Sequence, residues 1–130
     1  MKKRLSILLL FGFSLLIIFA GLTKWNFDIY MESTRLPPKD RVDIKVIIDN
    51  QVIFEDTLQQ NLAGFPTHNT HPMRIGYHTV SISSEQENIC LEKKMFLFFN
   101  NYLLLYYSFD ERNNKPSFFL DKGKGHFGFE

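Results

Sequence analysis

Hydrophobic and polar residues alternate with a period of two along much of the chain beyond residue 41. The segment VDIKVIID has Val or Ile at every even position from 42 to 48 and mostly polar residues between them. Such alternation is typical of a β-strand that is buried on one face. Asp49 and Asn50 form a turn signal, and the segment QVIFED that follows them predicts the return strand of a hairpin.

Four later stretches continue this pattern. MRIGYHTVSISS predicts two strands separated at Gly76, and ENICLEKKMFLFF and YLLLYYSF predict two more on either side of Asn100 and Asn101. Asparagine tolerates positive φ, so this Asn-Asn pair suits a tight primed turn. KPSFFLDKGKGHFGFE predicts a short strand, a glycine-rich turn and a last short strand. Residues 95–99 and 102–109 are apolar at successive positions, which indicates strands covered on both faces.

Turn signals recurring roughly every 8–12 residues favour an all-β domain. We therefore predict a small antiparallel β-sandwich of seven to eight strands over residues 42–130, with a barrel as the alternative. Its longest loop is expected at residues 58–72, where glycine, two prolines and two histidines gather.

The beginning of the chain has a different pattern. The basic residues Lys2, Lys3 and Arg4 precede residues 5–22, which carry no charge. As a helix this run would be about 27 Å long, close to the thickness of the hydrocarbon core of a bilayer. We predict a basic cytoplasmic tip at residues 1–4 and a single N-terminal transmembrane helix, a signal anchor, at residues 5–23. The positive-inside rule then places the remaining chain outside the cytoplasm, in the periplasm or at the cell surface.

A secretory leader that is cleaved is the alternative to a retained anchor. Such leaders have an apolar core of roughly 7–15 residues, followed by small residues at the cleavage site. Here bulky Ile18 and Phe19 occupy the positions where small residues are expected, which favours the anchor.

Residues 24–41 are expected to form a juxtamembrane stalk that ends at two consecutive prolines. Trp25, Phe27 and Tyr30 follow the apolar run closely, so we expect them at the membrane interface, where aromatic rings favour the headgroup layer.

Net charge and cysteine content indicate which partners and which cysteine chemistry are improbable for this chain. Of the 15 Lys and Arg residues, 12 follow the basic tip, against 14 Asp and Glu, which gives a net charge of −2 for the outer region. This near-neutral balance, without a basic stripe, disfavours nucleic acid as a partner. The single cysteine, Cys90, cannot form an internal disulfide and is expected to be buried and unreactive.

The order VIIDN, then a proline-bearing loop, then MRIGYHTVSI resembles PEGA-type modules, which are small β-sandwiches of the bacterial envelope. The resemblance covers residues 44–84. The Pro-Glu-Gly-Ala run is absent, and Asn50 stands where the modules usually have glycine. The resemblance implies a binding or structural module rather than an enzyme.

Candidate chemistry is sparse. GKGHFG matches a dinucleotide-binding glycine pattern, but no helix follows it, so a glycine-rich turn is the better interpretation. His68 and His71 could converge on one metal ion from a loop, with His78 completing the site, yet a solvated loop is the simpler interpretation. His78 is expected to hold a corner by hydrogen bonding. We predict no catalytic residues and no cofactor, and hence no enzyme.

Aromatic residues crowd the second half of the chain, and most are expected to fill the core. The tyrosines and the last phenylalanines are expected to reach a surface that docks a protein, a glycan or a second copy. The sequence thus favours a membrane-anchored, non-catalytic module that binds an envelope protein, with room for homo-oligomers. The alternative is an exported soluble protein that binds a metal or small ligand through residues 58–72.

Overall fold

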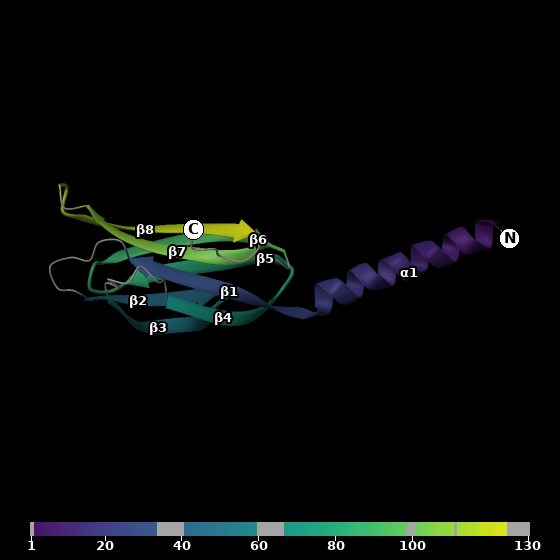
Figure 1. Ribbon diagram of the computed structural model, residues 1–130, viewed down its shortest axis with the longest axis horizontal. Helices are drawn as coiled ribbons and strands as arrows, with labels where there is room; N and C mark the ends of the chain where they lie inside the picture. Colours follow the sequence, from purple (N-terminus) through teal and green to yellow (C-terminus); the bar gives the residue numbers. More distant parts are fainter. Residues whose placement is uncertain (1, 34–40, 60–66, 99–100, 111, 125–130) are drawn as a thin grey trace.

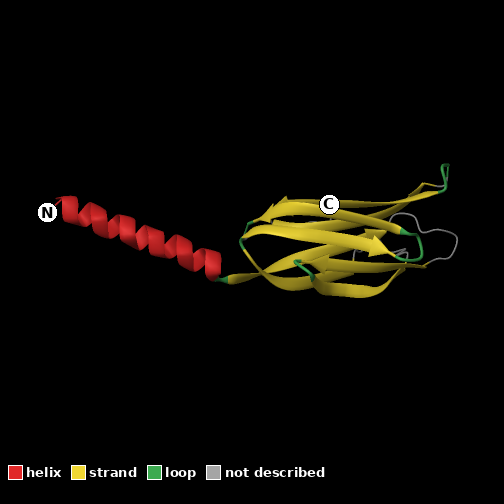
Figure 2. Ribbon diagram, turned by 180° about the vertical axis from the view of Figure 1, so that it is seen from behind, coloured by secondary structure: helices red, strands yellow, loops and turns green. Residues whose placement is uncertain are grey.

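The computed structural model describes residues 2–33, 41–59, 67–98, 101–110 and 112–124. One long helix projects from one end of an elongated body of β-strands (Figure 1). The strands form two packed layers, and the helix makes no layer of its own (Figure 2).

The elements follow the chain in a simple order: helix α1 (Lys2–Leu22), then strands β1 (Lys24–Ser33), β2 (Arg41–Ile48), β3 (Gln51–Gln59), β4 (Thr67–Arg74), β5 (Gly76–Ser84), β6 (Ile89–Leu97), β7 (Asn101–Asp110) and β8 (Lys115–Lys124). One sheet, called sheet A, has the order β4-β1-β7-β8, and the other, sheet B, has the order β3-β2-β5-β6. The prediction of a β-sandwich with seven to eight strands is therefore confirmed.

The period-two pattern gives the sandwich its core. In β2 the even positions from Val42 to Ile48 are buried and the residues between them face outward. The inward residues of β2, β5, β1 and β7 form one continuous hydrophobic cluster between the sheets. The hairpin between β2 and β3 also forms as predicted, because Asp49 and Asn50 adopt φ values of 49° and 65°, which suit a primed turn.

The stalk predicted at residues 24–41 is wrong for residues 24–33. These residues form β1, which pairs with β4 in antiparallel and with β7 in parallel orientation. Phe27, Ile29 and Met31 point into the core and are almost fully buried. The domain therefore begins at Lys24 rather than residue 42, and sheet A is mixed rather than purely antiparallel. Residues 34–40, the rest of the predicted stalk, lie outside the described residues.

The structure also corrects three smaller predictions. The loop expected at 58–72 is shorter, because β4 begins at Thr67, while residues 60–66 lie outside the described part. Asn101 is the first residue of β7, and its backbone N–H donates to the carbonyl oxygen of Phe98 at 2.9 Å. Because β6 and β7 lie in different sheets, this connection crosses between layers and does not close a hairpin. β8 continues through Gly123, where a glycine-rich turn was expected.

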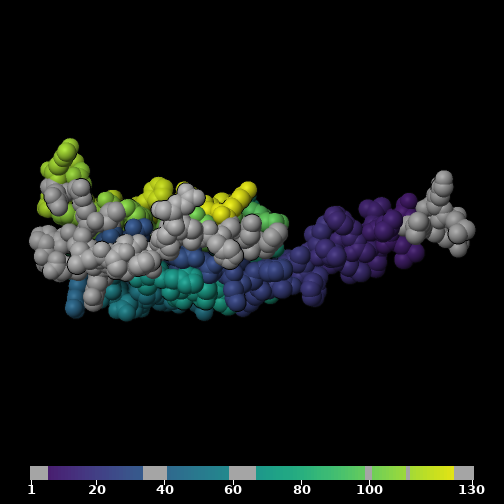
Figure 3. Space-filling view, in the orientation of Figure 1, coloured from purple at the N-terminus to yellow at the C-terminus, as the bar shows by residue number. Residues whose placement is uncertain are grey.

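Helix α1 exposes large apolar side chains on all sides. Ile7, Leu8, Leu9, Leu10 and Phe11 are each about two-thirds exposed, and successive residues of a helix point in different directions. The helix stands away from the sandwich as a separate rod (Figure 3). Within the described residues, no helix combines the length and the apolar character that a membrane crossing requires.

Two buried side-chain hydroxyls in the described part of the chain, those of Ser33 and Tyr107, find no hydrogen-bond partner. Burial raises the pKa of the Tyr107 phenol to about 12, with further contributions from Glu87 and Asp43. Tyr107 was expected to reach a surface, but its ring is fully buried against Phe118.

Replacing Tyr107 with phenylalanine is expected to leave the free energy of unfolding unchanged or to raise it by about 1 kcal/mol. The substitution keeps the ring and removes a buried hydroxyl whose desolvation is not offset by a hydrogen bond. Urea unfolding of the full chain in detergent, followed by circular dichroism, measures this change. A loss of more than about 1 kcal/mol would show that the hydroxyl has a stabilising partner.

Candidate functional site

The outer face of sheet A carries a cluster of aromatic and aliphatic side chains. Register places β1 residue Tyr30 beside Leu104 of β7, and Tyr106 of β7 beside Phe119 of β8. Alternation along each strand turns these side chains away from the core. We call the cluster the tyrosine face; it consists of Tyr30, Tyr102, Leu104, Tyr106 and Phe119.

The centre of the tyrosine face is held by ring contacts. Tyr30 stacks on His68 of β4 with a ring separation of 4.9 Å and meets Tyr102 edge-on at 5.7 Å. Nε2 of His68 lies 2.8 Å from a carboxylate oxygen of Asp28, which fixes the imidazole ring beside Tyr30. Partial burial, together with the charge of Asp28 and the neighbouring Tyr102, raises the pKa of Tyr30.

Tyr102 is placed by a glycine on the neighbouring strand. Its ring covers Gly123 so closely that a Cβ added there would lie 2.0 Å from the ring carbon Cζ. An aromatic ring over a strand glycine compensates for the missing side chain of that glycine. This contact explains why β8 runs through Gly123, although glycine usually weakens a strand interior.

A second polar cluster lies at the turn between β2 and β3. Asp49 accepts a hydrogen bond from the backbone N–H of Thr79 at 3.0 Å, and its other oxygen lies 2.5 Å from Nδ1 of His78. Nε2 of His78 donates to the carbonyl oxygen of Arg74 at 2.7 Å. Although burial raises the pKa of Asp49, the hydrogen bonds from His78 and Thr79 lower it overall. The predicted structural role of His78 at a corner is confirmed.

The three histidines do not assemble into a metal site. His68 and His71 lie on strand β4 rather than on a loop, and residues three apart on a strand face opposite sides of a sheet. His68 stacks on Tyr30 beside the tyrosine face, whereas His71 turns towards Asp49 and His78 at the edge of the sandwich. Burial lowers the pKa of His71, and Lys24 adds to this effect. No group of three potential ligands is found among the described residues, which exclude His126.

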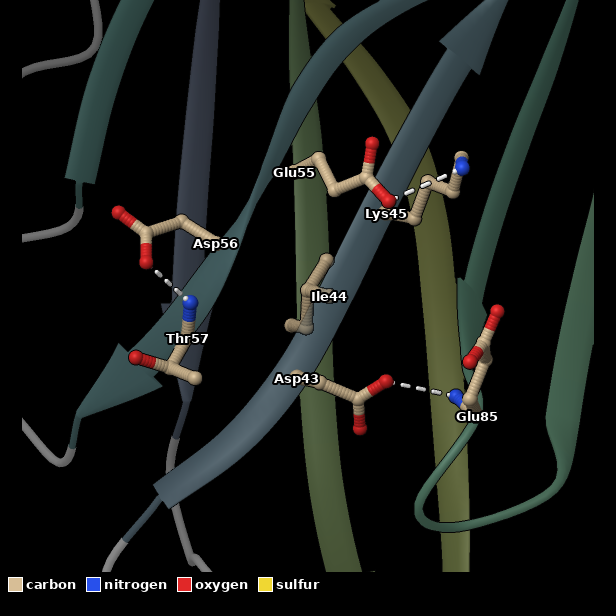
Figure 4. A pocket seen from close by; sticks show the side chains of 7 residues that line it. All are labelled: Asp43, Ile44, Lys45, Glu55, Asp56, Thr57 and Glu85. Atoms are coloured by element: carbon tan, nitrogen blue, oxygen red, sulfur yellow. Dashed lines mark hydrogen bonds and ion pairs between the residues drawn. The ribbon is translucent and has the colours of Figure 1, made fainter.

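An acidic depression of about 290 Å³ opens on sheet B (Figure 4). It is lined by residues of β2, β3 and the turn after β5: Asp43, Ile44, Lys45, Glu55, Asp56, Thr57 and Glu85. The carboxylate of Asp43 accepts hydrogen bonds from the Ser84 hydroxyl at 2.6 Å and from the backbone N–H groups of Glu85 and Gln86 at 2.7 and 3.1 Å. This carboxylate therefore holds the β5–β6 turn.

The other charged residues of the depression also make contacts that are common on an exposed sheet surface. Lys45 and Glu55 form an exposed ion pair at 3.0 Å across β2 and β3. Asp56 accepts from the backbone N–H of Thr57. The arrangement is a solvated sheet surface beside a turn that Asp43 holds in place.

Cys90 differs from its prediction. The thiol is exposed on the outer face of sheet B, where its sulfur lies 3.7 Å from the Ser81 hydroxyl. The expectation of a buried cysteine is wrong because residue 90 falls on the outward phase of β6.

The three residues predicted at the membrane interface separate in the fold. Trp25 stays exposed next to α1, whereas Phe27 is fully buried in the sandwich core. Tyr30 belongs to the tyrosine face. Placing Phe27 at an interface is therefore wrong, and the reason is that β1 continues the two-residue alternation immediately after the helix.

Comparison with known proteins found no matching family model, no matching curated protein and no matching solved structure. The resemblance of residues 44–84 to PEGA-type modules therefore stays a prediction.

Proposed function

We propose that this chain is a non-catalytic module of the cell envelope, attached to the membrane through α1, and that it binds a protein partner with the tyrosine face. The observation that carries the proposal is the aromatic cluster on sheet A. The bacterial envelope setting follows the sequence resemblance.

Membrane attachment is proposed from the surface of α1. A helix with apolar side chains on every side needs apolar surroundings, either lipid or protein. No helix in the described residues is long and apolar enough for a complete crossing, so the proposal rests on this exposed surface and on the basic residues at the start of α1. Insertion predicts that the full chain stays with membranes after alkaline carbonate extraction, without shortening.

The tyrosine face has the composition of a protein-binding surface. Tyrosine supplies a large apolar area and a hydroxyl at little conformational cost, and it is enriched among the residues that dominate binding energy. Three of the five members are tyrosines, and Phe119 remains 56% exposed. The ring contacts of Tyr30 and the hydrogen bond of His68 pre-arrange the face, which lowers the entropy lost on binding.

The engaged carboxylates support a non-catalytic role. Asp43 holds a turn and Asp49 holds His78 and the start of β5. Groups with such structural partners stabilise the fold, and general acid–base chemistry would require a group that can reach a substrate.

The alternative is an exported soluble protein that binds a small ligand near residues 58–72. Its metal version loses support because His68 and His71 face opposite sides of β4. Residues 60–66 lie outside the described residues, so no geometry favours the remaining small-ligand version.

Photo-crosslinking in native membranes tests the docking face. A photoreactive amino acid at Phe119 is expected to give one defined adduct, whereas the same residue at Thr79, on the outer face of sheet B, is expected to give none. An adduct of twice the chain mass would identify the partner as a second copy. Equal labelling at both positions, or no adduct at Phe119, would overturn the proposed docking face.

A further inference from the structure

The end of the sandwich that joins α1 gathers exposed aromatic residues that the sequence did not single out together. Register brings Tyr77 of β5 opposite Phe96 of β6, at the last rungs of that ladder. Phe98 follows β6 at the same end, and Trp25 lies at the start of β1. The exposed fractions are 70% for Tyr77, 46% for Phe98, 41% for Phe96 and 39% for Trp25. We call this the proximal end.

Strand pairing proves that these residues share one end. Lys24 of β1 pairs with Arg74 of β4, and β5 begins two residues after Arg74. Gly76 in turn pairs with Leu97, and Asn101 pairs with Lys124. All of these positions lie where α1 enters the sandwich (Figure 1).

Basic side chains surround the aromatic residues. The exposed basic residues at or near the proximal end are Lys24, Arg74, Lys94, Lys122 and Lys124. Lys94 lies over the Tyr77 ring at 5.6 Å, and the same ring meets Phe96 edge-on at 5.1 Å. Among the described residues, the nearby acidic groups are Asp49, which faces His78, and Asp121.

The opposite end of the sandwich carries charges of both signs, and its basic residues are Arg41, Arg112 and Lys115. The turn between β5 and β6 carries Glu85 and Glu87, and Asp43 lies against it. Asp110 ends β7 at this same end. In the described part of the domain, exposed aromatic and basic residues thus gather near α1, whereas the far end has charges of both signs.

The connection between α1 and the sandwich is very short. Only Thr23 separates Leu22 from Lys24, and its backbone N–H and hydroxyl both donate to the carbonyl oxygen of Phe19. A connection this short cannot hold the sandwich away from any surface into which α1 inserts.

We propose that the proximal end rests in the headgroup layer of an anionic lipid bilayer. Aromatic rings favour this layer because one part of the ring is apolar and another is polar, and lysine and arginine are attracted to anionic headgroups. The proposal rests on the proposed insertion of α1. It adds a defined orientation of the sandwich, in which the proximal end contacts the lipid and the tyrosine face stands at a steep angle to the membrane surface.

Two matched labels on the full chain test the orientation. Gln51 lies beside Lys24 and Arg74 at the proximal end. In a Cys90→Ser background, Gln51→Cys places an environment-sensitive fluorophore there, and Gln86→Cys places it in the distant β5–β6 turn. Vesicles of phosphatidylglycerol and phosphatidylcholine carry a spin-labelled headgroup lipid as quencher. Quenching at Gln51 is expected to be severalfold stronger than at Gln86.

Variants then identify the groups responsible. Tyr77→Ser with Phe96→Ser should weaken quenching at Gln51, and Arg74→Gln with Lys124→Gln should weaken it only when phosphatidylglycerol is present. Phe119→Ser, on the tyrosine face, is the matched control and should leave quenching unchanged.

The outcomes separate the two proposals. Equal quenching at Gln51 and Gln86, with the chain still retained by the vesicles after carbonate, would overturn the orientation and leave membrane attachment intact. Release of the chain by carbonate would overturn the attachment on which the orientation rests. Strong quenching at Gln51 that is insensitive to all four substitutions would also overturn the proposal, because Thr23 alone would then account for the proximity.

Discussion

Replacing Phe27 with alanine is expected to lower the free energy of unfolding by about 3–5 kcal/mol. The ring is fully buried between the two sheets, so its removal loses apolar burial and leaves a cavity in the core. Urea unfolding of the full chain in detergent, followed by circular dichroism of the β-sandwich, measures the change. A large loss would place this aromatic residue in the core of the domain.

Phe119→Ala is the matched control, since it removes the same ring from the exposed tyrosine face. We expect a change of about 1 kcal/mol or less, as is usual for surface substitutions. If Phe27→Ala were as mild as Phe119→Ala and instead weakened membrane retention, β1 would not be a core strand and the stalk interpretation would return.

Replacing Asp43 with asparagine is expected to lower the free energy of unfolding by about 2 kcal/mol at neutral pH. The carboxylate accepts three hydrogen bonds from the β5–β6 turn, and an amide presents N–H groups where one oxygen now accepts. The same unfolding measurement applies. Asp56→Asn is the matched control, because Asp56 is exposed and its carboxylate accepts from the backbone N–H of the neighbouring Thr57 rather than from a distant turn.

The pH dependence of stability offers a second measurement on Asp43. Burial raises its pKa, but the hydrogen bonds from Ser84, Glu85 and Gln86 lower it overall, below the usual 3.8. A carboxyl group with a lowered pKa in the folded state contributes stability that is fully present above the unfolded-state pKa and is lost as pH falls through the folded one.

The native chain should therefore lose stability as the pH drops below about 3.8, and the Asp43→Asn variant should lose less. Asp49, whose pKa is also lowered, accounts for part of the remaining slope. Identical slopes for the variant and the native chain would show that the Asp43 contacts do not stabilise the fold.

The strand pattern was largely readable from the residues. Alternation from Val42 to Ile48 and the Asp49–Asn50 turn predicted the first hairpin, and both are present. The same rule would have found β1, because Trp25, Phe27, Ile29 and Met31 also occur at every second position. That signal was missed because the stretch directly follows a helix-like apolar run.

The candidate site was only partly predictable. The sequence shows that tyrosines are abundant, but not which of them point outward in a shared sheet. Tyr106 and Tyr107 are neighbours in the chain, yet one lies on the tyrosine face and the other is buried, because successive strand residues face opposite sides. The pairing of β1 with β7 brings Tyr30 into contact with Tyr102, although the two residues are far apart in the sequence. No local sequence pattern indicates this pairing.

The sequence by itself determined the all-β character of the domain, most of its strands and the separate apolar helix, because burial period and turn chemistry act over a few residues. The tertiary structure alone decided which strands are neighbours, that β1 completes sheet A in parallel with β7, and that His68 and His71 are kept apart. These outcomes depend on how two sheets bury their inner faces together, and that packing is a property of the whole chain rather than of any segment.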